Sequence, residues 1–137
     1  SLAGAKLPKK QPIDGSDVSP LLVGKEIAER SIFWHYPLYL KGKGLVIDLP
    51  NGKTYSWRGF PSTSLLRGQW KLIEFHEDDS IGLYNLKEDP GETNNLAKEM
   101  PERAAKLRAE LDAWQKRTKA PIPTLPNPEC IFESNKK

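Results

Sequence analysis

The sequence predicts an α+β domain in which an antiparallel sheet of about four strands carries one amphipathic C-terminal helix, with an extended arm at each end. Three observations predict this fold class. Short runs rich in β-branched and aromatic residues lie between residues 31 and 86, and three of them are joined by short polar connections. One helical stripe of apolar side chains follows these runs. The 12 prolines and 10 glycines disfavour a bundle built only of helices.

The composition argues against several functional classes. The 21 basic and 18 acidic residues give a net charge of +3, and the clearest basic pairs, Lys9-Lys10 and Lys136-Lys137, lie close to the ends. No basic face for nucleic acid is therefore expected. No apolar run approaches the roughly 20 residues of a membrane-spanning helix, so no membrane partner is expected either. Cys130 is the single cysteine, which excludes an intrachain disulfide.

Residues 1–30 are predicted to form a connecting arm. Pro8, Pro12, Gly15 and Pro20 prevent a long regular element there, because proline removes a backbone donor and glycine costs conformational entropy. A single helical turn starting near Pro20 is compatible with this pattern.

The first strand is predicted at residues 31–36, SIFWHY, and Pro37 ends it. The next stretch, residues 41–60, carries four glycines and an Asn51-Gly52 turn signal. This pattern fits either a hairpin of its own or a long irregular loop.

The clearest strands follow this stretch. Residues 64–67 (SLLR) and 70–75 (WKLIEF) are separated by Gly68-Gln69, a connection of the length found in tight hairpins. Residues 81–86 (IGLYNL) follow after another short polar turn. Strands so close in the chain are expected to pair antiparallel.

One helix is predicted after the strands, from Pro101 to residue 119. Its apolar positions fall at helical spacings of three and four and form one stripe: Ala104, Leu107, Leu111 and Trp114. Pro121 prevents its continuation. A helix with a single apolar stripe is expected to lie on the sheet. Residues 31–119 are thus the predicted domain, and residues 120–137 a proline-rich, extended tail.

No complete catalytic constellation is visible in the residues. There is no Cys-x-x-Cys or His-x-x-x-His spacing for a metal, no P-loop and no Gly-x-Ser-x-Gly motif. Cys130 lies in the proline-rich tail, where no helix N-terminus lowers its pKa, so an unreactive thiol is expected. The acidic stretches at 76–79 and 88–95 are interpreted as a hairpin tip and an Asp-Pro-Gly turn. No catalytic residue and no metal ligand is therefore predicted in this chain.

Three stretches taken together nevertheless resemble a known family. These are Trp-Lys-Leu-Ile-Glu-Phe at 70–75, Leu-Tyr-Asn-Leu-Lys-Glu-Asp-Pro-Gly-Glu-Thr-Asn-Asn-Leu-Ala at 83–97, and Phe-Trp-His-Tyr-Pro at 33–37. With the proline-started helix, they resemble the C-terminal subdomain of bacterial sulfatases of the arylsulfatase type, the formylglycine-dependent sulfatases. The resemblance covers essentially the whole chain and implies a small antiparallel sheet with one packed helix.

The resemblance also implies what this chain lacks. In the family the nucleophile is a formylglycine made from a Cys/Ser-x-Pro-x-Arg motif, beside a calcium ion, and both belong to a large N-terminal α/β domain. This sequence contains no such motif, since Cys130 is followed by Ile-Phe-Glu-Ser. The chain is therefore expected to be a part of a sulfatase that is inactive by itself. Its expected partners are the N-terminal domain and a sulfated substrate, and a periplasmic or secreted location follows from the family.

Two residues are candidate substrate contacts by this resemblance. His35 could donate a hydrogen bond to an anionic oxygen of a sugar or sulfate group, and Ser62 matches a place that reaches the substrate in some members. The family often has arginine where this chain has Leu66, with Arg67 one place later. An equally supported interpretation makes His35 a histidine packed at the interface with the N-terminal domain.

An alternative function is a free-standing module that binds a glycan or a protein without catalysis. One structural feature separates the two functions. A free-standing module is expected to have polar outer faces, whereas a part of a larger enzyme is expected to expose one large apolar surface.

Overall fold

The computed structural model describes residues 4, 10, 15–41, 47–48, 54–55, 57–125, 127 and 132–133. The chain divides into two units, residues 1–30 and residues 31–137. The described part of the first unit holds one short 3-10 helix, η1 (Ser19–Val23), which has Pro20 in its first turn and contains no buried residue. Gly24 ends η1 with a left-handed φ of 71°, a conformation that glycine adopts without strain.

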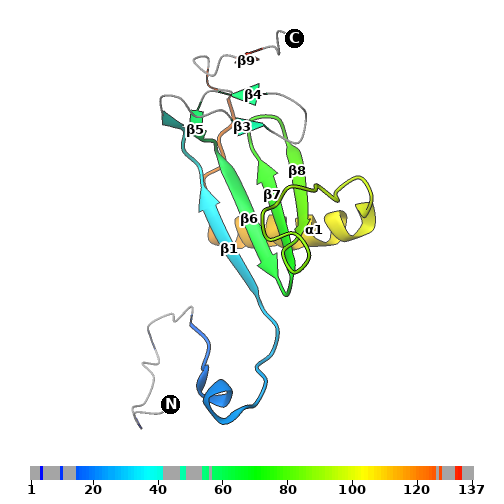
Figure 1. Ribbon diagram of the computed structural model, residues 1–137. Helices are drawn as coiled ribbons and strands as arrows, with labels where there is room; N and C mark the ends of the chain where they lie inside the picture. The colour runs from blue at the N-terminus through cyan, green and yellow to red at the C-terminus, as the bar shows by residue number, and fades with distance from the viewer. Residues whose placement is uncertain are drawn as a thin grey trace. The chain divides into compact units, whose positions relative to one another are not determined.

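The second unit contains the sheet and the helix (Figure 1). Its elements are β1 (Ser31–Tyr36), β2 (Leu40–Lys41), β3 (Ile47–Asp48), β4 (Thr54–Tyr55), β5 (Trp57–Gly59), β6 (Ser62–Arg67), β7 (Trp70–Phe75), β8 (Ser80–Asn85), α1 (Pro101–Thr118) and β9 (Phe132–Glu133). The main sheet has four strands in the order β1-β6-β7-β8, and each neighbouring pair is antiparallel. The predicted α+β fold class is confirmed.

The stretch between β1 and β6 contributes only short strands. β2 pairs with β5, and β3 pairs with β4, which also pairs with β9 from the C-terminal segment. The sequence left open whether this stretch forms a hairpin or an irregular loop, and the described residues show short antiparallel pairs. The predicted Asn51-Gly52 turn lies outside the described residues, as does Cys130.

Two strands begin earlier than their sequence patterns indicate. β6 starts at Ser62 rather than at residue 64, because Ser62 and Thr63 pair with β1 on one side and with β7 on the other. β8 starts at Ser80, whose N–H donates to Asp78 Oδ1 at 3.0 Å in the preceding turn. The tight β6–β7 turn uses Gly68 at a φ of 56°, as the two-residue connection predicts.

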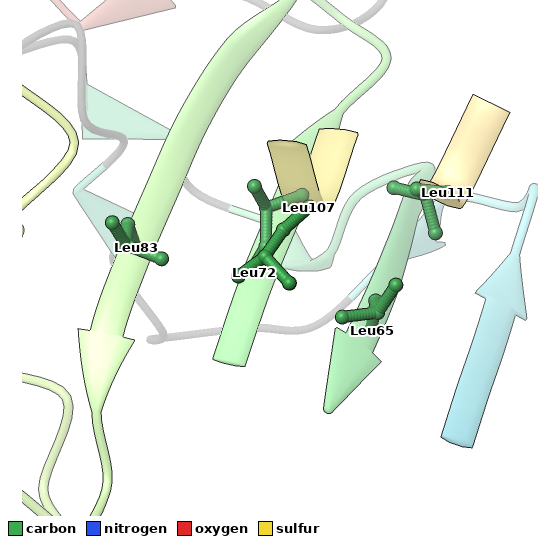
Figure 2. Packing of buried hydrophobic residues seen from close by; sticks show 5 residues of the cluster. All are labelled: Leu65, Leu72, Leu83, Leu107 and Leu111. Atoms are coloured by element: carbon green, nitrogen blue, oxygen red, sulfur yellow. The ribbon is translucent and has the colours of Figure 1, made fainter. Parts of the chain in front are cut away.

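The core lies between one face of the sheet and α1. Leu65, Leu72 and Leu83 stand opposite one another on β6, β7 and β8, and Leu107 and Leu111 of α1 pack against them (Figure 2). These two leucines belong to the stripe that predicts the helix. Figure 1 shows α1 lying across one face of the four-stranded sheet only.

The outer edge of β8 is closed by the connection that leads to α1. Leu83 N–H donates to Asn95 Oδ1 at 3.0 Å, and Asn95 Nδ2 donates to the carbonyl of Ile81 at 3.1 Å. Leu96 N–H donates to the carbonyl of Leu83 at 2.8 Å. The backbone groups of β8 that point away from β7 at these positions are thus satisfied within the chain.

The leucine core predicts the effect of one substitution. Leu111 is fully buried, so Leu111→Ala removes buried apolar volume and should lower the free energy of unfolding by about 2–5 kcal/mol. Urea unfolding followed by circular dichroism measures this loss. Leu125→Ala is the matched control, because Leu125 is 81% exposed and its truncation should change the free energy by no more than about 0.5 kcal/mol. Equal effects of the two substitutions would contradict the proposed core.

Candidate functional site

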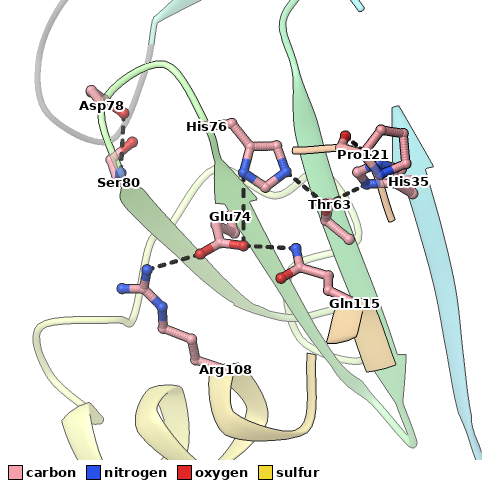
Figure 3. Close-up of polar contacts among 9 residues, drawn as sticks. All are labelled: His35, Thr63, Glu74, His76, Asp78, Ser80, Arg108, Gln115 and Pro121. Atoms are coloured by element: carbon pink, nitrogen blue, oxygen red, sulfur yellow. Dashed lines mark hydrogen bonds and ion pairs between the residues drawn. The ribbon is translucent and has the colours of Figure 1, made fainter. Parts of the chain in front are cut away.

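His35 lies near the end of β1 on the face of the sheet that α1 covers. It pairs with Thr63 of β6, and its Nδ1 is 2.7 Å from Thr63 Oγ1. Its Nε2 is 3.1 Å from the carbonyl oxygen of Pro121, in the segment that follows α1 (Figure 3). Both ring nitrogens of this predicted site residue are therefore engaged within the chain.

The contacts of His35 continue into a buried polar network. Thr63 Oγ1 is 2.7 Å from Nε2 of His76, whose Nδ1 lies 3.9 Å from Glu74 Oε2 (Figure 3). Glu74 is 6% exposed and accepts hydrogen bonds from Arg108 Nη2 at 2.8 Å and from Gln115 Nε2 at 3.0 Å. The charge of the Glu74 carboxylate is thus balanced by a guanidinium from α1, as a buried charge requires.

The type of acceptor at one end of the network indicates which atom donates the proton in each hydrogen bond. The carbonyl of Pro121 can only accept, so His35 Nε2 carries a proton. In neutral His35 the Nδ1 is then an acceptor and receives the Thr63 hydroxyl proton. Thr63 Oγ1 in turn accepts from His76 Nε2–H. When both histidines are neutral, each of these three hydrogen bonds therefore has one donor and one acceptor.

The surroundings of His76 favour that neutral state. Burial is the main cause that lowers the pKa of His76 below its usual value of 6.5. The negative charge of Glu74 acts in the opposite direction, while the positive charge of Arg108, and that of His35 whenever it is protonated, add to the lowering. Protonated His35 and His76 would both have to donate to the same Thr63 hydroxyl, which adds to their mutual repulsion.

The network joins four elements and the segment after the helix. Thr63 links β1 to β6 and β7 through the two histidines, Glu74 links β7 to α1, and His35 holds the carbonyl of Pro121. Ring contacts add to this, since Trp114 lies edge-on to His35 with centroids 6.3 Å apart. This geometry supports a structural role for His35. Its predicted substrate contact is untested and stays a prediction.

Ser62, the second predicted site residue, lies on the opposite face of the sheet. It stands between Tyr36 of β1 and Phe75 of β7, whereas His35 pairs with Thr63 on the α1 side. The structure therefore does not bring His35 and Ser62 together. The Ser62 hydroxyl makes no hydrogen bond within the part of the chain that the structure describes.

The face that carries Ser62 is rich in apolar side chains and is not covered by α1. We call it the open face, and its large apolar residues are Ile32, Trp34, Tyr36, Leu66, Ile73, Phe75 and Tyr84. Trp34 is 51% exposed, and none of the seven is fully buried. Lys71 is the charged residue of this face in the four strands, and it forms a 2.6 Å ion pair with Glu92. The apolar side chains of the open face are thus exposed along β1 and only partly exposed along β7 and β8.

The two acidic stretches have structural roles. In the first, Asp78 accepts from the backbone of Ser80, and Glu77 accepts from the hydroxyl of Tyr39. In the second, Asp89 accepts from Asn94 N–H at 2.8 Å, a bond that is the main cause of its lowered pKa. Among the described residues, no group of three or more His, Cys, Asp or Glu side chains is placed to hold a metal ion. No described helix is long and apolar enough to cross a membrane.

Sequence reasoning missed the network partners Thr63, Glu74 and His76. One signal was available, because Glu74 shares its strand face with Leu72 at a spacing of two and must therefore be buried with it. A carboxylate on a core face needs a cationic or hydrogen-bonding partner. Which residue provides it depends on the packing of α1, which the strand pattern does not encode.

Comparison with known proteins adds relatives of one kind. The chain is 33% identical over 130 residues to a sulfatase from Formosa agariphila, a match that spans 88% of this chain and 22% of that protein. It is 35% identical over 102 residues to human arylsulfatase A, a match that spans 70% of this chain and 20% of that protein. The chain thus spans about a fifth of the length of these curated relatives. No protein-family model matches it.

Solved structures show the same fold. A candidate sulfatase from Bacteroides thetaiotaomicron and a 2-O GAG sulfatase each superpose with a TM-score of 0.63 at 23% identity. Each match covers 94% of this chain and 26% of the solved chain. At this identity the likeness shows the fold alone.

The lowered pKa of His76 predicts how stability depends on pH. In the unfolded chain the imidazole regains its usual pKa of 6.5, so the unfolded state takes up a proton that the folded state does not. The free energy of unfolding should therefore fall as the pH drops through about 6.5, and level off once the lower folded pKa is passed. Urea unfolding at a series of pH values measures this dependence.

His76→Gln is the variant that tests the assignment. The amide can still donate to Thr63 but does not titrate, so the loss of stability between about pH 7 and pH 5 should become smaller than in the unaltered chain. Asp17→Asn is the control, since this exposed carboxyl titrates in a lower range and should leave that interval unchanged. The same slope in the unaltered chain and in His76→Gln would refute the buried neutral histidine.

Proposed function

This chain matches the C-terminal part of sulfatases, and we propose that it works as that part of an enzyme that hydrolyses sulfate esters of sulfated sugars or aryl compounds. Because it spans only about a fifth of its curated relatives, hydrolysis belongs in this proposal to the larger polypeptide. The predicted periplasmic or secreted location is part of the same proposal.

Neither the sequence nor the described residues fit the two groups that the chemistry of the family needs. The sequence has no Cys/Ser-x-Pro-x-Arg motif for a formylglycine, and the described residues offer no cluster of metal ligands for calcium. We therefore assign both groups to the larger N-terminal part, and this chain by itself is proposed to be inactive.

The observation that carries the proposal is the open face. A sheet covered by a helix on one face only, with Trp34 and its apolar neighbours on the other, has the character of a surface that another part of the protein covers. The single charge of this face in the four strands, on Lys71, is already paired with Glu92, so no unpaired cation would be buried there. The large N-terminal domain of the same enzyme is the partner that we propose for it.

The proposed contribution to the substrate pocket follows from the same geometry. Ser62 lies on the open face, and its hydroxyl makes no hydrogen bond to the described residues, which supports a contact at the junction with the larger domain. His35 could contribute only by exchanging its acceptor, the carbonyl of Pro121, for a sulfate oxygen. Such an exchange is chemically reasonable, because a hydrogen bond to an anionic oxygen is stronger than one to a neutral carbonyl.

A second function is favoured by one specific observation. Trp34 and Tyr36 are both more than a third exposed. They lie two residues apart on β1, so their side chains are neighbours on the same face of the sheet. Exposed aromatic rings so arranged can pack on a sugar ring, as a free-standing glycan-binding module requires. The two functions differ in whether a larger domain covers these rings.

An activity measurement on the natural polypeptide tests the main proposal. Its intact mass should exceed that of this chain several-fold, and it should release sulfate from 4-nitrophenyl sulfate or from a panel of sulfated saccharides. The 137-residue chain alone should release none. In the natural polypeptide, Ser62→Ala should reduce kcat/KM by up to about tenfold through a raised KM, as expected for one lost hydrogen bond.

Thr118→Ala is the matched control, because this hydroxyl lies on the exposed end of α1 and should not affect KM. A natural polypeptide that ends near the bounds of this chain, or one that releases no sulfate from any ester, would overturn the proposal. Saturable binding of a glycan by the chain alone, together with either result, would support the binding module instead.

A further inference from the structure

The two edge strands of the main sheet, β8 and β1, differ in whether their outward backbone groups are hydrogen-bonded within the described part of the chain. The edge at β8 is closed by Asn95 and Leu96, which bond the outward backbone groups of Ile81 and Leu83. The edge at β1 has no such cover, because no hydrogen bond reaches the backbone of residues 31–36 from outside the sheet within the described part of the chain.

The register shows which groups of β1 point outward. His76 N–H donates to the carbonyl of Pro61 at 2.9 Å, so the odd-numbered residues of β6 direct their backbone groups to β7. The even-numbered residues of β6 then face β1, where they pair with Ile32, Trp34 and Tyr36. The N–H and C=O groups of the remaining residues point away from the sheet, and these residues are Ser31, Phe33 and His35.

β1 lacks the features by which proteins protect an open edge. It is six residues long, contains no charged residue and no proline, and pairs with β6 without a bulge. Trp34 and two apolar neighbours, Ile32 and Tyr36, are exposed along it. Natural edge strands are usually short, charged, bulged or covered, because an open apolar edge templates aggregation. The absence of every other device leaves coverage as the means of protection.

We propose that the outer edge of β1 pairs with an extended strand contributed by the larger part of the same polypeptide, so that the four-stranded sheet is continued across the domain boundary. The inference rests on the proposed function, which supplies the larger part, and deepens it by naming the mode of contact. The length of the relatives supports this occupant, since this chain spans only 22% and 20% of them. Continuity supports it too, because the exposed side chains of β1 also belong to the open face.

The proposal distinguishes two kinds of contact. Side-chain packing on the open face would bury Trp34 but would leave the outward N–H groups of Phe33 and His35 bonded to water rather than to an acceptor in the protein. An added strand supplies a carbonyl to each of these groups, and the same groups then define its register. The incoming strand should be largely uncharged, with alternate apolar residues beside Ile32 and Trp34.

Residue-resolved amide hydrogen exchange tests the proposal without any substitution. In the 137-residue chain at low concentration, the amides of Phe33 and His35 should exchange fast, while that of Trp34, bonded to β6, should be slow. In the natural polypeptide, the amides of Phe33 and His35 should slow by roughly a hundredfold or more, because each gains a backbone acceptor. Trp34 is the internal control within the same strand.

Three results would overturn the inference, and each is distinct from failure of the proposed function. The first is fast exchange at Phe33 and His35 in a natural polypeptide that releases sulfate, which would leave the enzyme intact and the added strand refuted. The second is protection that grows with the concentration of the isolated chain and is unchanged in the natural polypeptide, which would make a second copy the occupant. The third is protection of the Phe33 and His35 amides that is as strong in the isolated chain, at every concentration, as in the natural polypeptide. Absence of sulfate release, by contrast, would be a failure of the proposed function, whatever the exchange shows.

Discussion

The packing of α1 on the sheet is the interaction on which the other features of this unit depend. Leu107 and Leu111 meet three leucines that stand opposite one another on adjacent strands. Full burial of such a side chain contributes about 1.5–3 kcal/mol relative to exposure, which is a large share of the stability of a small domain. One helix has one apolar stripe, so it can cover only one face of the sheet.

Because α1 covers one face only, the candidate site residues lie in two different surroundings, His35 on the covered face and Ser62 on the open face. On the covered face, the polar network of His35, Thr63, His76 and Glu74 continues the core towards the ends of β1, β6 and β7 and fastens the segment after α1. Its hydrogen bonds are satisfied when the histidines are neutral, which supports a structural role. On the open face, the apolar side chains and the Ser62 hydroxyl have no comparable partners in the described residues. The proposed contact with a larger domain therefore concerns the open face and the neighbouring edge of β1.

Much of the fold could be predicted from the sequence, because the information was local. The 70–75 strand, the Gly68-Gln69 turn and the helix that begins at Pro101 each follow from period, turn residues or an apolar stripe. The sequence left open a hairpin in the stretch that holds β3 and β4, but the pairing of β4 with β9 from the far end of the chain could not be predicted. Their two-residue length leaves no periodic signal.

The site was less predictable, because it depends on register. The alternation in β1 separates His35 from Trp34, but only the pairing of β1 with β6 shows that His35 meets Thr63 while Ser62 faces the other way. The role of Glu74 likewise depends on where α1 places Arg108 and Gln115. Residue types suggested the candidate residues, and the three-dimensional pairing decided which of them share a face.

The most direct test of the proposed contact with a larger domain is whether the open face is covered in the natural polypeptide. Ser64 lies on that face opposite Trp34, and Ala113 lies on the exposed side of α1, so cysteines placed there with Ser64→Cys and Ala113→Cys report on the two surfaces. Their rates of alkylation, read by peptide mass spectrometry in a Cys130→Ser background, would be compared between the 137-residue chain and the natural polypeptide. If a larger domain covers the open face, alkylation of only the cysteine at position 64 should be slower in the natural polypeptide, by on the order of tenfold or more. Equal alkylation of that cysteine in both proteins would contradict the proposed contact.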